Sequence, residues 1–149
     1  MRLLDPVFRK HKLGYVLQCL LATGVITAIL FALDAAKNAA VIGALGASAF
    51  VAFGMPHARV SRPRFLLGGY LVGLFSAGVC VLISQAPQVQ AIPLSEGHKA
   101  AIFGALAVGM SIFLMSITET EHPPAAGLAL GLALGEFSKM SVAVILTGI

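Results

Sequence analysis

The sequence predicts an all-α membrane protein, a bundle of about four transmembrane helices with a short or broken helix near the C-terminus. Of its 149 residues, 58% are hydrophobic and only 11% are charged, whereas about 25% of the residues in an average soluble domain are charged. The apolar residues also form segments of about 20 residues, the length that crosses a bilayer as a helix. The chain has the length of one domain, and we expect residues 1–149 to form it.

Four apolar segments are the expected transmembrane helices, and polar or proline-containing loops separate them. In order, they are Leu13–Leu33, Ala39–Met55, Phe65–Gln85 and Ala100–Ile117. The second is at the short end of the range that crosses a membrane and is rich in Gly, Ala and Ser. The first follows a basic flank, residues 1–12, and no small-residue cleavage site stands out there. We therefore expect a retained first helix and not a signal peptide.

The C-terminal part of the chain has two interpretations. Ala125–Gly135 is apolar but too short to cross a membrane alone, and Glu136 and Lys139 interrupt the apolar pattern after it. Either residues 125–149 form one helix in which Glu136 and Lys139 pair at i,i+3, or Ala125–Gly135 is a half-helix and residues 140–149 open a further span. No polar flank follows the last residue, from which we expect a shortened C-terminus.

Lysine and arginine residues predict the orientation, because loops rich in them stay on the cytoplasmic side. The flank before the first span and the loop after the second span are basic, whereas the two other loops carry one lysine each. These residues are, in turn, Arg2, Arg9, Lys10 and Lys12; Arg59, Arg62 and Arg64; and Lys37 and Lys99. We therefore expect a multi-pass protein of the cell inner (plasma) membrane with its N-terminus in the cytoplasm.

A polar cluster at Thr118–Pro124 lies between two apolar segments and has the sequence Thr-Glu-Thr-Glu-His-Pro-Pro. Ionisable groups cost about 2.5–3.5 kcal/mol each at the centre of a bilayer on insertion scales. Pro123 and Pro124 break the incoming helix and suit the first turn of an outgoing one, with Thr120 or His122 as its cap. An interrupted helix start presents free N–H groups and a partial positive charge, which favour an anion. The alternative is a cytoplasmic turn with solvated charges.

Two further groups are candidates for the same site. His57, Arg62 and Arg64 belong to the loop after the second span, where arginines usually determine topology; alternatively, they form an electropositive vestibule that gathers anions. Ser48 lies among small residues, where a serine most often bonds its own helix backbone. It can instead donate a hydrogen bond to a permeating solute.

Small residues recur at every fourth position in three segments, so that each set shares one helix face. Such faces let helix backbones approach closely in lipid. We expect them to be packing faces, with the alternative that one of them lines a narrow path. The sets are Gly69, Gly73 and Ala77; Gly127, Gly131 and Gly135; and Ala101, Ala105 and Gly109.

Several classes of protein are disfavoured. The basic residues flank membrane segments and do not indicate nucleic-acid binding. Cys19 and Cys80 lie inside apolar segments, so neither suggests a disulfide or metal framework. No hydrolase elbow and no glycine-rich phosphate loop is present. We expect a protein that needs no cofactor and is not an enzyme. A metal-dependent membrane enzyme is the option that we rank third, after a transporter and a membrane module without flux. The residues that suggest it are His57, Glu119, Glu121 and His122, which lack the spacing of a zincin helix.

Two stretches resemble the HPP family of integral membrane proteins. His122-Pro123-Pro124-Ala125, preceded by Thr118 and Thr120, is similar to the signature of that family. Its second recognisable stretch has counterparts, in order and at similar spacing, in Gly46-Ala-Ser-Ala49, Pro56, Pro63-Arg64 and Gly68-Gly69. The resemblance covers roughly residues 15–135. Departures from the family pattern are Glu119, Glu121 and Tyr70, which stands where a histidine is expected.

The resemblance implies a small multi-span transporter, and plant and cyanobacterial relatives are associated with nitrite movement across membranes. We therefore expect a transporter or channel for a small inorganic anion, nitrite first, that forms a homo-oligomer, dimer before trimer. The expected binding residues are His122, Pro123, Pro124, Ala125, Thr118, Thr120 and Ser48, and Glu119, Glu121 and His122 are expected to couple protons. The alternative is a membrane assembly or sensory module without flux, in which the small-residue faces serve only protein contacts.

Overall fold

In the computed structural model, the described residues are 12–33, 39–136 and 139–148, and they are helical with short connections. The helices are α2 (Lys12–Leu33), α3 (Ala39–Ala49), α4 (Pro63–Ser84), α5 (Pro87–Gln90), α6 (Glu96–Thr118), α7 (Pro123–Gly131) and α8 (Lys139–Gly148). Two π-helical turns, Phe50–Gly54 and Leu132–Glu136, extend α3 and α7, and Arg59–Ser61 forms a 3₁₀ turn. The predicted all-α class is confirmed, since no strand occurs in the described ranges.

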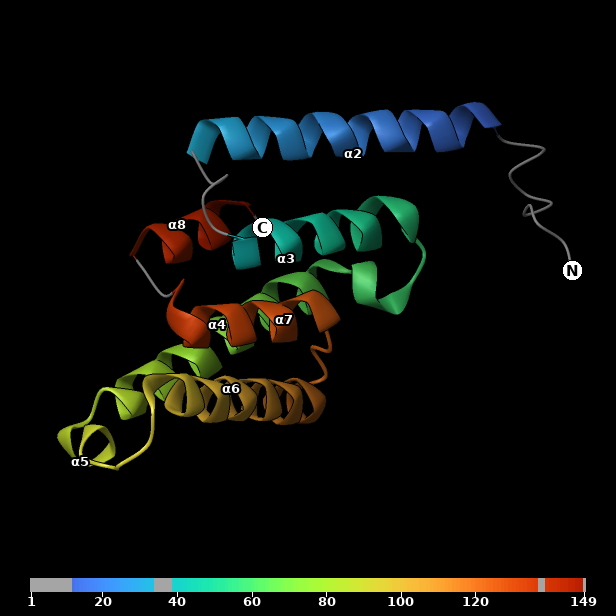
Figure 1. The fold of residues 1–149 in the computed structure, drawn as a ribbon. Coiled ribbons are helices and arrows are strands. Elements are labelled where there is room, and N and C mark those ends of the chain that lie inside the picture. Colours follow the sequence, from blue (N-terminus) through green and yellow to red (C-terminus); the bar gives the residue numbers. More distant parts are fainter. Residues whose placement is uncertain (1–11, 34–38, 137–138, 149) are drawn as a thin grey trace, which may run out of the picture.

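Helix α7 is the innermost element of the bundle. It packs against α3, α4 and α6, and α4 and α6 also pack along each other (Figure 1). Ala125, Leu128 and Ala129 of α7 are fully buried in the apolar core. Helix α2 runs along the outer side of α3 and contacts α3 and the π turn that follows it. Two short predicted apolar segments, Ala39–Met55 and Ala125–Gly135, thus lie side by side as α3 and α7.

Two described helices, α4 and α6, are long and apolar enough to cross a membrane. They match the predicted segments Phe65–Gln85 and Ala100–Ile117, except that α6 begins earlier. Ser95 caps α6 by accepting a hydrogen bond from His98 N–H at 3.3 Å, which places Lys99 inside the helix. Helix α2 coincides in its bounds with the first predicted span, but its apolar stretch Val16–Ala28 is shorter than a membrane-spanning helix, as are α3 with its π turn and α7.

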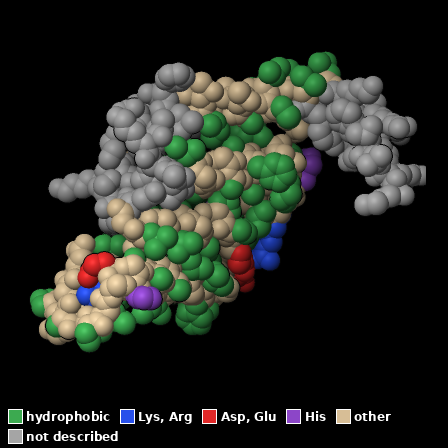
Figure 2. Space-filling view, viewed as in Figure 1, with side chains coloured by type: hydrophobic (Ala, Val, Ile, Leu, Met, Phe, Trp, Pro, Cys, Tyr) green, Lys and Arg blue, Asp and Glu red, His purple; other side chains and the backbone are tan. Residues whose placement is uncertain are grey.

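The outward faces of the two long helices are apolar. The large hydrophobic side chains that they expose include Leu67, Leu71, Phe75 and Leu82 on α4 and Leu106, Phe113 and Ile117 on α6. Figure 2 shows hydrophobic side chains along the flank of the bundle, with charged side chains gathered toward its ends. Soluble monomers rarely expose large contiguous apolar patches. This surface is suited to contact with lipid.

The chain after α7 is broken. Helix α7 passes into the π turn Leu132–Glu136, in which Gly135 has φ +120°, a conformation that interrupts a regular helix and suits glycine. The interpretation of residues 125–149 as one helix is therefore wrong, and the short-helix alternative describes Ala125–Gly135 better. The predicted Glu136–Lys139 ion pair lies outside the part of the chain whose side chains are described, as does the basic flank over residues 1–11.

Of the three predicted small-residue faces, the one on α4 packs inside the protein. Gly69, Gly73 and Ala77 are buried, and a Cβ at Gly73 would lie 2.7 Å from the carbonyl oxygen of Ala125. In contrast, Gly109 on α6 and Gly127 on α7 are exposed, and a Cβ added to either would have no neighbour within 4 Å. The packing prediction is confirmed for α4, whereas these glycines and the exposed Ala101 and Ala105 face outward and do not pack within one chain, so that for them it stays a prediction.

Candidate functional site

The predicted break ahead of the two prolines is confirmed. Helix α6 ends at Thr118, and Glu119 adopts a left-handed conformation with φ 51° that turns the chain. His122 is extended and precedes Pro123 and Pro124, which occupy the first turn of α7. His122 is therefore the N-cap residue of α7, one of the two residues predicted for that position. Its side chain forms no hydrogen bond with the backbone at the start of the helix.

The side chain of His122 lies in the protein core and joins two hydroxyl groups. It exposes none of its surface, and its Nε2 lies 2.7 Å from Ser48 Oγ. The same oxygen lies 2.7 Å from the hydroxyl of Tyr70, whose ring is tilted against the imidazole at 5.3 Å between centroids. Three helices thus contribute to one buried Ser48–Tyr70–His122 cluster, Ser48 from α3, Tyr70 from α4 and His122 from the start of α7.

One atom of this cluster has no hydrogen-bond partner. Among the described residues, His122 Nδ1 is a buried nitrogen that no donor or acceptor contacts. Most buried polar groups in proteins are paired, and leaving one unpaired costs about 1–3 kcal/mol. The side chain of Ser48 forms hydrogen bonds to Tyr70 and His122, so the interpretation that it only bonds its own helix backbone is wrong.

Three glycines of α4 make room for the turn that carries His122. A Cβ at Gly69 would lie 2.4 Å from His122 Cβ, and one at Gly68 would lie 2.5 Å from Thr120 Cγ2. Non-bonded carbon atoms do not approach each other this closely, so a methyl group added at either glycine would force the turn away from α4. Together with Gly73, these residues let the backbone of the turn and of α7 lie directly on α4.

The cluster lies well inside the length of α4. Tyr70 follows the first residue of this helix, Pro63, by seven positions, which is about 10 Å at 1.5 Å per residue. Since α4 is long enough to cross a membrane, the imidazole lies below the end of the bundle and not in the loop layer.

The expected backbone donors at the start of α7 are not available. Pro123 and Pro124 have no N–H group, and the N–H of Ala125 donates to His122 O at 2.9 Å. The prediction that N–H groups after Pro124 bind an anion is therefore wrong for Ala125. A helix start normally leaves its first N–H groups free. Here the first two positions are prolines, which have no N–H group, and the third N–H group is bonded within the first turn.

The two threonines that were predicted to donate to a solute are engaged elsewhere. Thr118 Oγ1 donates to Leu114 O at 2.7 Å, and it lies 2.8 Å from Thr120 Oγ1. Since Thr118 has one hydroxyl hydrogen, Thr120 donates to Thr118. Both hydroxyl hydrogens are thus occupied, and neither threonine contacts the imidazole. Thr120 is buried against Gly68 and packs the turn onto α4.

The two carboxylates of the polar cluster face outward. Glu119 and Glu121 are exposed, and Glu119 Oε2 pairs with Arg59 Nη2 at 3.2 Å. Glu119 therefore binds Arg59 and not Arg62 or Arg64. In the described part of the chain, no hydrogen bond joins either carboxylate to His122, so the structure separates the residues that were predicted to couple protons.

The arginine loop lies beside the turn. Arg64 Nη2 donates to Thr118 O at 3.1 Å, and Arg59 lies 5.0 Å above the ring of Phe65. Arg62 and His57 are exposed at the same end. Ser61 anchors this loop by donating to Val51 O at 2.9 Å. The predicted vestibule residues thus form an exposed basic rim at the same end of the bundle as the turn.

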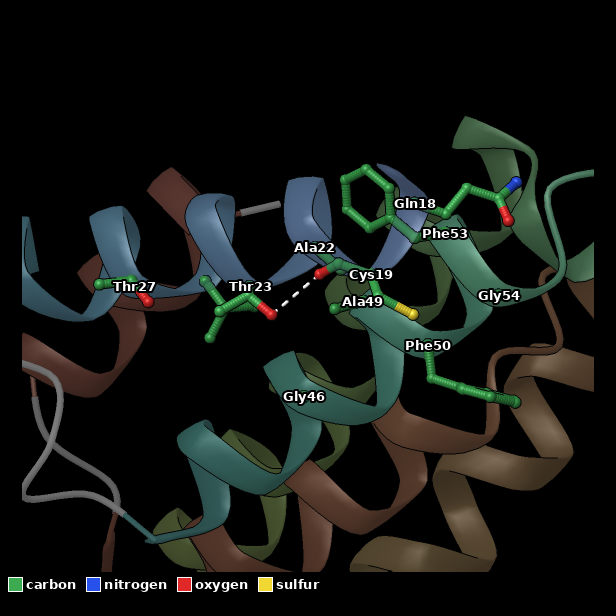
Figure 3. A pocket seen from close by; sticks show the side chains of 11 residues that line it. Gln18, Cys19, Ala22, Thr23, Thr27, Gly46, Ala49, Phe50, Phe53 and Gly54 are labelled. Atoms are coloured by element: carbon green, nitrogen blue, oxygen red, sulfur yellow. Dashed lines mark hydrogen bonds between the residues drawn. The ribbon is translucent and has the colours of Figure 1, made fainter. Parts of the chain in front are cut away.

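A cavity of about 630 Å³ lies away from this cluster, between α2 and α3. Its lining includes Gln18, Cys19 and Thr23 of α2 and Phe50 and Phe53 of the π turn after α3 (Figure 3). The hydroxyl of Thr23 donates to Cys19 O at 2.9 Å. Gly46 and Ala49 line this cavity, whereas Ser48 between them points to the other side of α3. The cavity and the buried cluster are therefore separate features.

Tyr70 was not among the residues predicted for the site. Its signal in the sequence is its position directly after Gly68 and Gly69, at a departure from the family pattern. The residues that suggested the option of a metal-dependent enzyme are not brought together, since no group of three or more His, Cys, Asp or Glu within the described ranges is placed to hold a metal ion. The structure assembles Ser48, Tyr70 and His122 instead.

Comparisons with known proteins agree on the class of this chain. A sequence profile for a family described as "HPP, transmembrane region" matches residues 8–149. A transmembrane protein of Dictyostelium discoideum is 32% identical over 104 residues, which are 70% of this chain and 33% of that protein. The chain thus spans about a third of the length of that relative. No solved structure gives a significant match.

Proposed function

The chain belongs to the HPP transmembrane family and is a membrane protein, and on this premise we propose that it is a transporter or channel for a small inorganic anion, with nitrite as the leading candidate. The solute would pass the buried cluster at the break between α6 and α7. His122 and Ser48 are the predicted binding residues that the structure keeps together, and Tyr70 joins them.

The unpartnered Nδ1 of His122 is the observation that carries this proposal. A fully buried imidazole with one unpaired nitrogen costs free energy in the absence of a ligand. Polar groups kept inside a membrane protein at such a cost are the usual mark of a solute or ion pathway. The nitrogen also belongs to the motif on which the resemblance to the family rests, which supports a role in binding.

The charges at the nearby end of the bundle support an anion as the solute. Arg62 and Arg64 are exposed there, and the negative charge of Glu119 is offset by Arg59. Exposed positive charge at an entrance raises the local concentration of anions and their rate of arrival. We propose proton coupling at His122 alone, because Glu121 is exposed and shows no contact with the imidazole.

The proposal also covers the number of membrane spans, the orientation of the chain and its oligomeric state. We propose four spans, α2, α3, α4 and α6, in the cell inner membrane, with the basic N-terminal flank in the cytoplasm. We also propose a homodimer. The exposed small residues of α6, Ala101, Ala105 and Gly109, support it, because such faces associate closely in lipid.

A membrane assembly or sensory module without flux is the second candidate function. One observation favours it: Ser48, Tyr70 and His122 are almost fully enclosed, and the cavity between α2 and α3 does not reach them. In that case the cluster would only fix α3, α4 and α7 in one arrangement. We propose no enzymatic activity, and substoichiometric metal in purified protein would remove the option of a metal-dependent enzyme.

Nitrite uptake by proteoliposomes tests the proposal. Wild-type protein is compared with His122→Ala and with Ser76→Ala, which removes a buried hydroxyl of α4 that has no hydrogen-bond partner among the described residues. We expect wild type and Ser76→Ala to take up nitrite and folded His122→Ala to have lost uptake. Absence of uptake of nitrite and nitrate by folded wild-type protein would contradict transport and favour the module.

A further inference from the structure

The hydrogen bonds of the Ser48–Tyr70–His122 cluster restrict where the imidazole hydrogen lies. Ser48 Oγ is 2.7 Å from both Tyr70 OH and His122 Nε2. A serine hydroxyl has one hydrogen and can accept twice, but accepting from both neighbours would leave its own hydrogen unpaired; Ser48 therefore donates to one neighbour and accepts from the other. An uncharged imidazole likewise has one N–H group, on either Nδ1 or Nε2. Two arrangements therefore satisfy both short contacts.

The two arrangements differ in what they leave unpaired. If Tyr70 donates to Ser48 and Ser48 donates to Nε2, the imidazole hydrogen is on Nδ1, and Nδ1–H is the one donor without a partner. If Nε2–H donates to Ser48 and Ser48 donates to Tyr70, the hydroxyl hydrogen of Tyr70 and the lone pair of Nδ1 both lack partners. In the described part of the chain, Ser48 is the hydrogen-bond partner of Tyr70. The first arrangement leaves fewer buried groups unpaired and is therefore the more stable.

The imidazole is uncharged in both arrangements. His122 exposes none of its surface, and a buried charge needs a counter-ion close by. The carboxylates on the same turn do not supply one, because Glu119 pairs with Arg59 at the surface and Glu121 is exposed. The arginines of the neighbouring loop are also exposed. The position of the single imidazole hydrogen thus decides whether Nδ1 is a donor or an acceptor.

We propose that Tyr70 is a positioning residue that acts through Ser48 to keep the imidazole hydrogen of His122 on Nδ1. The rings of Tyr70 and His122 lie 5.3 Å apart and tilted by 47°, so the tyrosine also holds the plane of the imidazole. The outcome is a buried N–H donor that has no hydrogen-bond acceptor among the described residues. Tyr70 itself need not touch the solute.

This arrangement defines the class of solute, a step that rests on the proposed transport function. An uncharged N–H donor pairs with a solute that offers an acceptor oxygen, such as an oxyanion, and not with a cation that offers only N–H donors. Without Tyr70, Ser48 is bound by His122 alone, and either direction of that bond leaves one hydrogen unpaired. The fraction of molecules in which the imidazole hydrogen is on Nδ1 then falls, and Nδ1 is a hydrogen-bond donor in fewer of them.

The tautomer is measured directly by ¹⁵N solid-state NMR of protein in lipid bilayers. His11→Gln, His57→Gln and His98→Gln are combined so that His122 is the only histidine, and the protein is labelled with ¹⁵N-histidine. Protonated and unprotonated ring nitrogens have separate resonances, so each tautomer is identified by which nitrogen carries the hydrogen. The spectrum is compared with those of Tyr70→Phe and Ser76→Ala in the same background.

We expect the parent and Ser76→Ala to be protonated on Nδ1 and Tyr70→Phe to lose a large share of that population. A parent protonated on Nε2, or a Tyr70→Phe spectrum identical to the parent, would overturn the proposal. If Tyr70→Phe does not fold, Ser48→Ala serves in its place, because it cuts the same link and is expected to shift the tautomer likewise. An unchanged tautomer in folded Ser48→Ala overturns the proposal as well.

Nitrite uptake separates this inference from the proposed function. If wild-type protein transports nitrite, Tyr70→Phe is expected to show reduced uptake, and full uptake together with a shifted tautomer would overturn the role of Tyr70 in selecting the solute. If wild-type protein transports nothing, the transport function fails. The tautomer measurement then still decides whether Tyr70 positions the imidazole hydrogen.

Discussion

Ser48 and His122 are 74 positions apart in the sequence, yet Ser48 Oγ and His122 Nε2 lie 2.7 Å apart in the core of the bundle. This contact joins the short helix α3 to the start of the short helix α7. Helix α7 lies against the glycine face of α4, and Tyr70 of α4 completes the hydrogen-bonded chain. The interior of the protein is thus organised around one imidazole.

Removal of the Ser48 hydroxyl is expected to destabilise the protein. Ser48→Ala leaves Tyr70 OH and His122 Nε2 buried without partners, which lowers the free energy of unfolding by about 1–3 kcal/mol. Ser76→Ala is the matched control, since Ser76 is also fully buried but has no hydrogen-bond partner among the described residues. Thermal unfolding in detergent measures both. A Tm of Ser48→Ala equal to that of Ser76→Ala would contradict the importance of this bond.

Substitution of Gly69 is expected to displace the turn that carries His122. The added methyl group of Gly69→Ala would lie 2.4 Å from His122 Cβ, and overpacking of this kind costs about 1–3 kcal/mol or more. Gly127→Ala on α7 has open space around the new Cβ and gains about 0.5–1 kcal/mol from helix propensity. The two variants should therefore shift Tm in opposite directions, and a tolerated Gly69→Ala would argue against close packing of the turn on α4.

Glycine at position 119 is expected to stabilise the turn. Glu119 has φ 51°, a left-handed conformation that costs about 1–2 kcal/mol in residues other than glycine and that glycine commonly adopts after a helix. The ion pair with Arg59 that Glu119→Gly removes is exposed and worth about 0–1 kcal/mol. Tm should rise. Arg59→Ala removes the same ion pair, together with the contact of Arg59 with the Phe65 ring, and leaves the conformation of Glu119 in place. A lower Tm in Glu119→Gly than in Arg59→Ala would contradict this assignment.

Neutralisation of Arg62 is expected to weaken nitrite uptake at low ionic strength. Arg62 is exposed at the end of the bundle that holds the turn, so Arg62→Gln lowers the local concentration of anions. The effect should shrink at about 0.1 M salt and above, where the Debye length is about 10 Å or less. Arg62→Lys keeps the charge and should behave as wild type. An effect of Arg62→Gln that does not depend on salt would point to a structural role.

Hydropathy and proline positions predicted most of the helical plan. The bounds of α2 and α4 lie within about two residues of the predicted segments, because apolar runs end where charge or proline begins. The start of α6 was placed too late, since Lys99 ends the apolar run although Ser95 caps the helix before it. Lys99 is tolerated there because its Nζ binds Gln90 O and Glu96 at 3.0 Å.

The candidate site was predicted only in part. The motif identified His122, and the small residues around Ser48 marked α3 as a helix that packs closely. The sequence does not show which side chains meet across helices, so Tyr70 was missed and Thr118 was assigned to a solute although Leu114 O binds it. Free amides were expected from the general rule for helix starts, but the prolines and Ala125 leave none at the first three positions.

The central claim is that the unpaired Nδ1 of the buried imidazole binds the transported anion. Titration of nitrite into the bilayer sample in which His122 is the only histidine tests it most directly, with both ring nitrogens observed by ¹⁵N NMR. We predict a saturable shift of the Nδ1 resonance, with the Nε2 resonance, held by Ser48, nearly unchanged. An Nδ1 resonance that stays fixed at nitrite concentrations that saturate uptake would contradict the account.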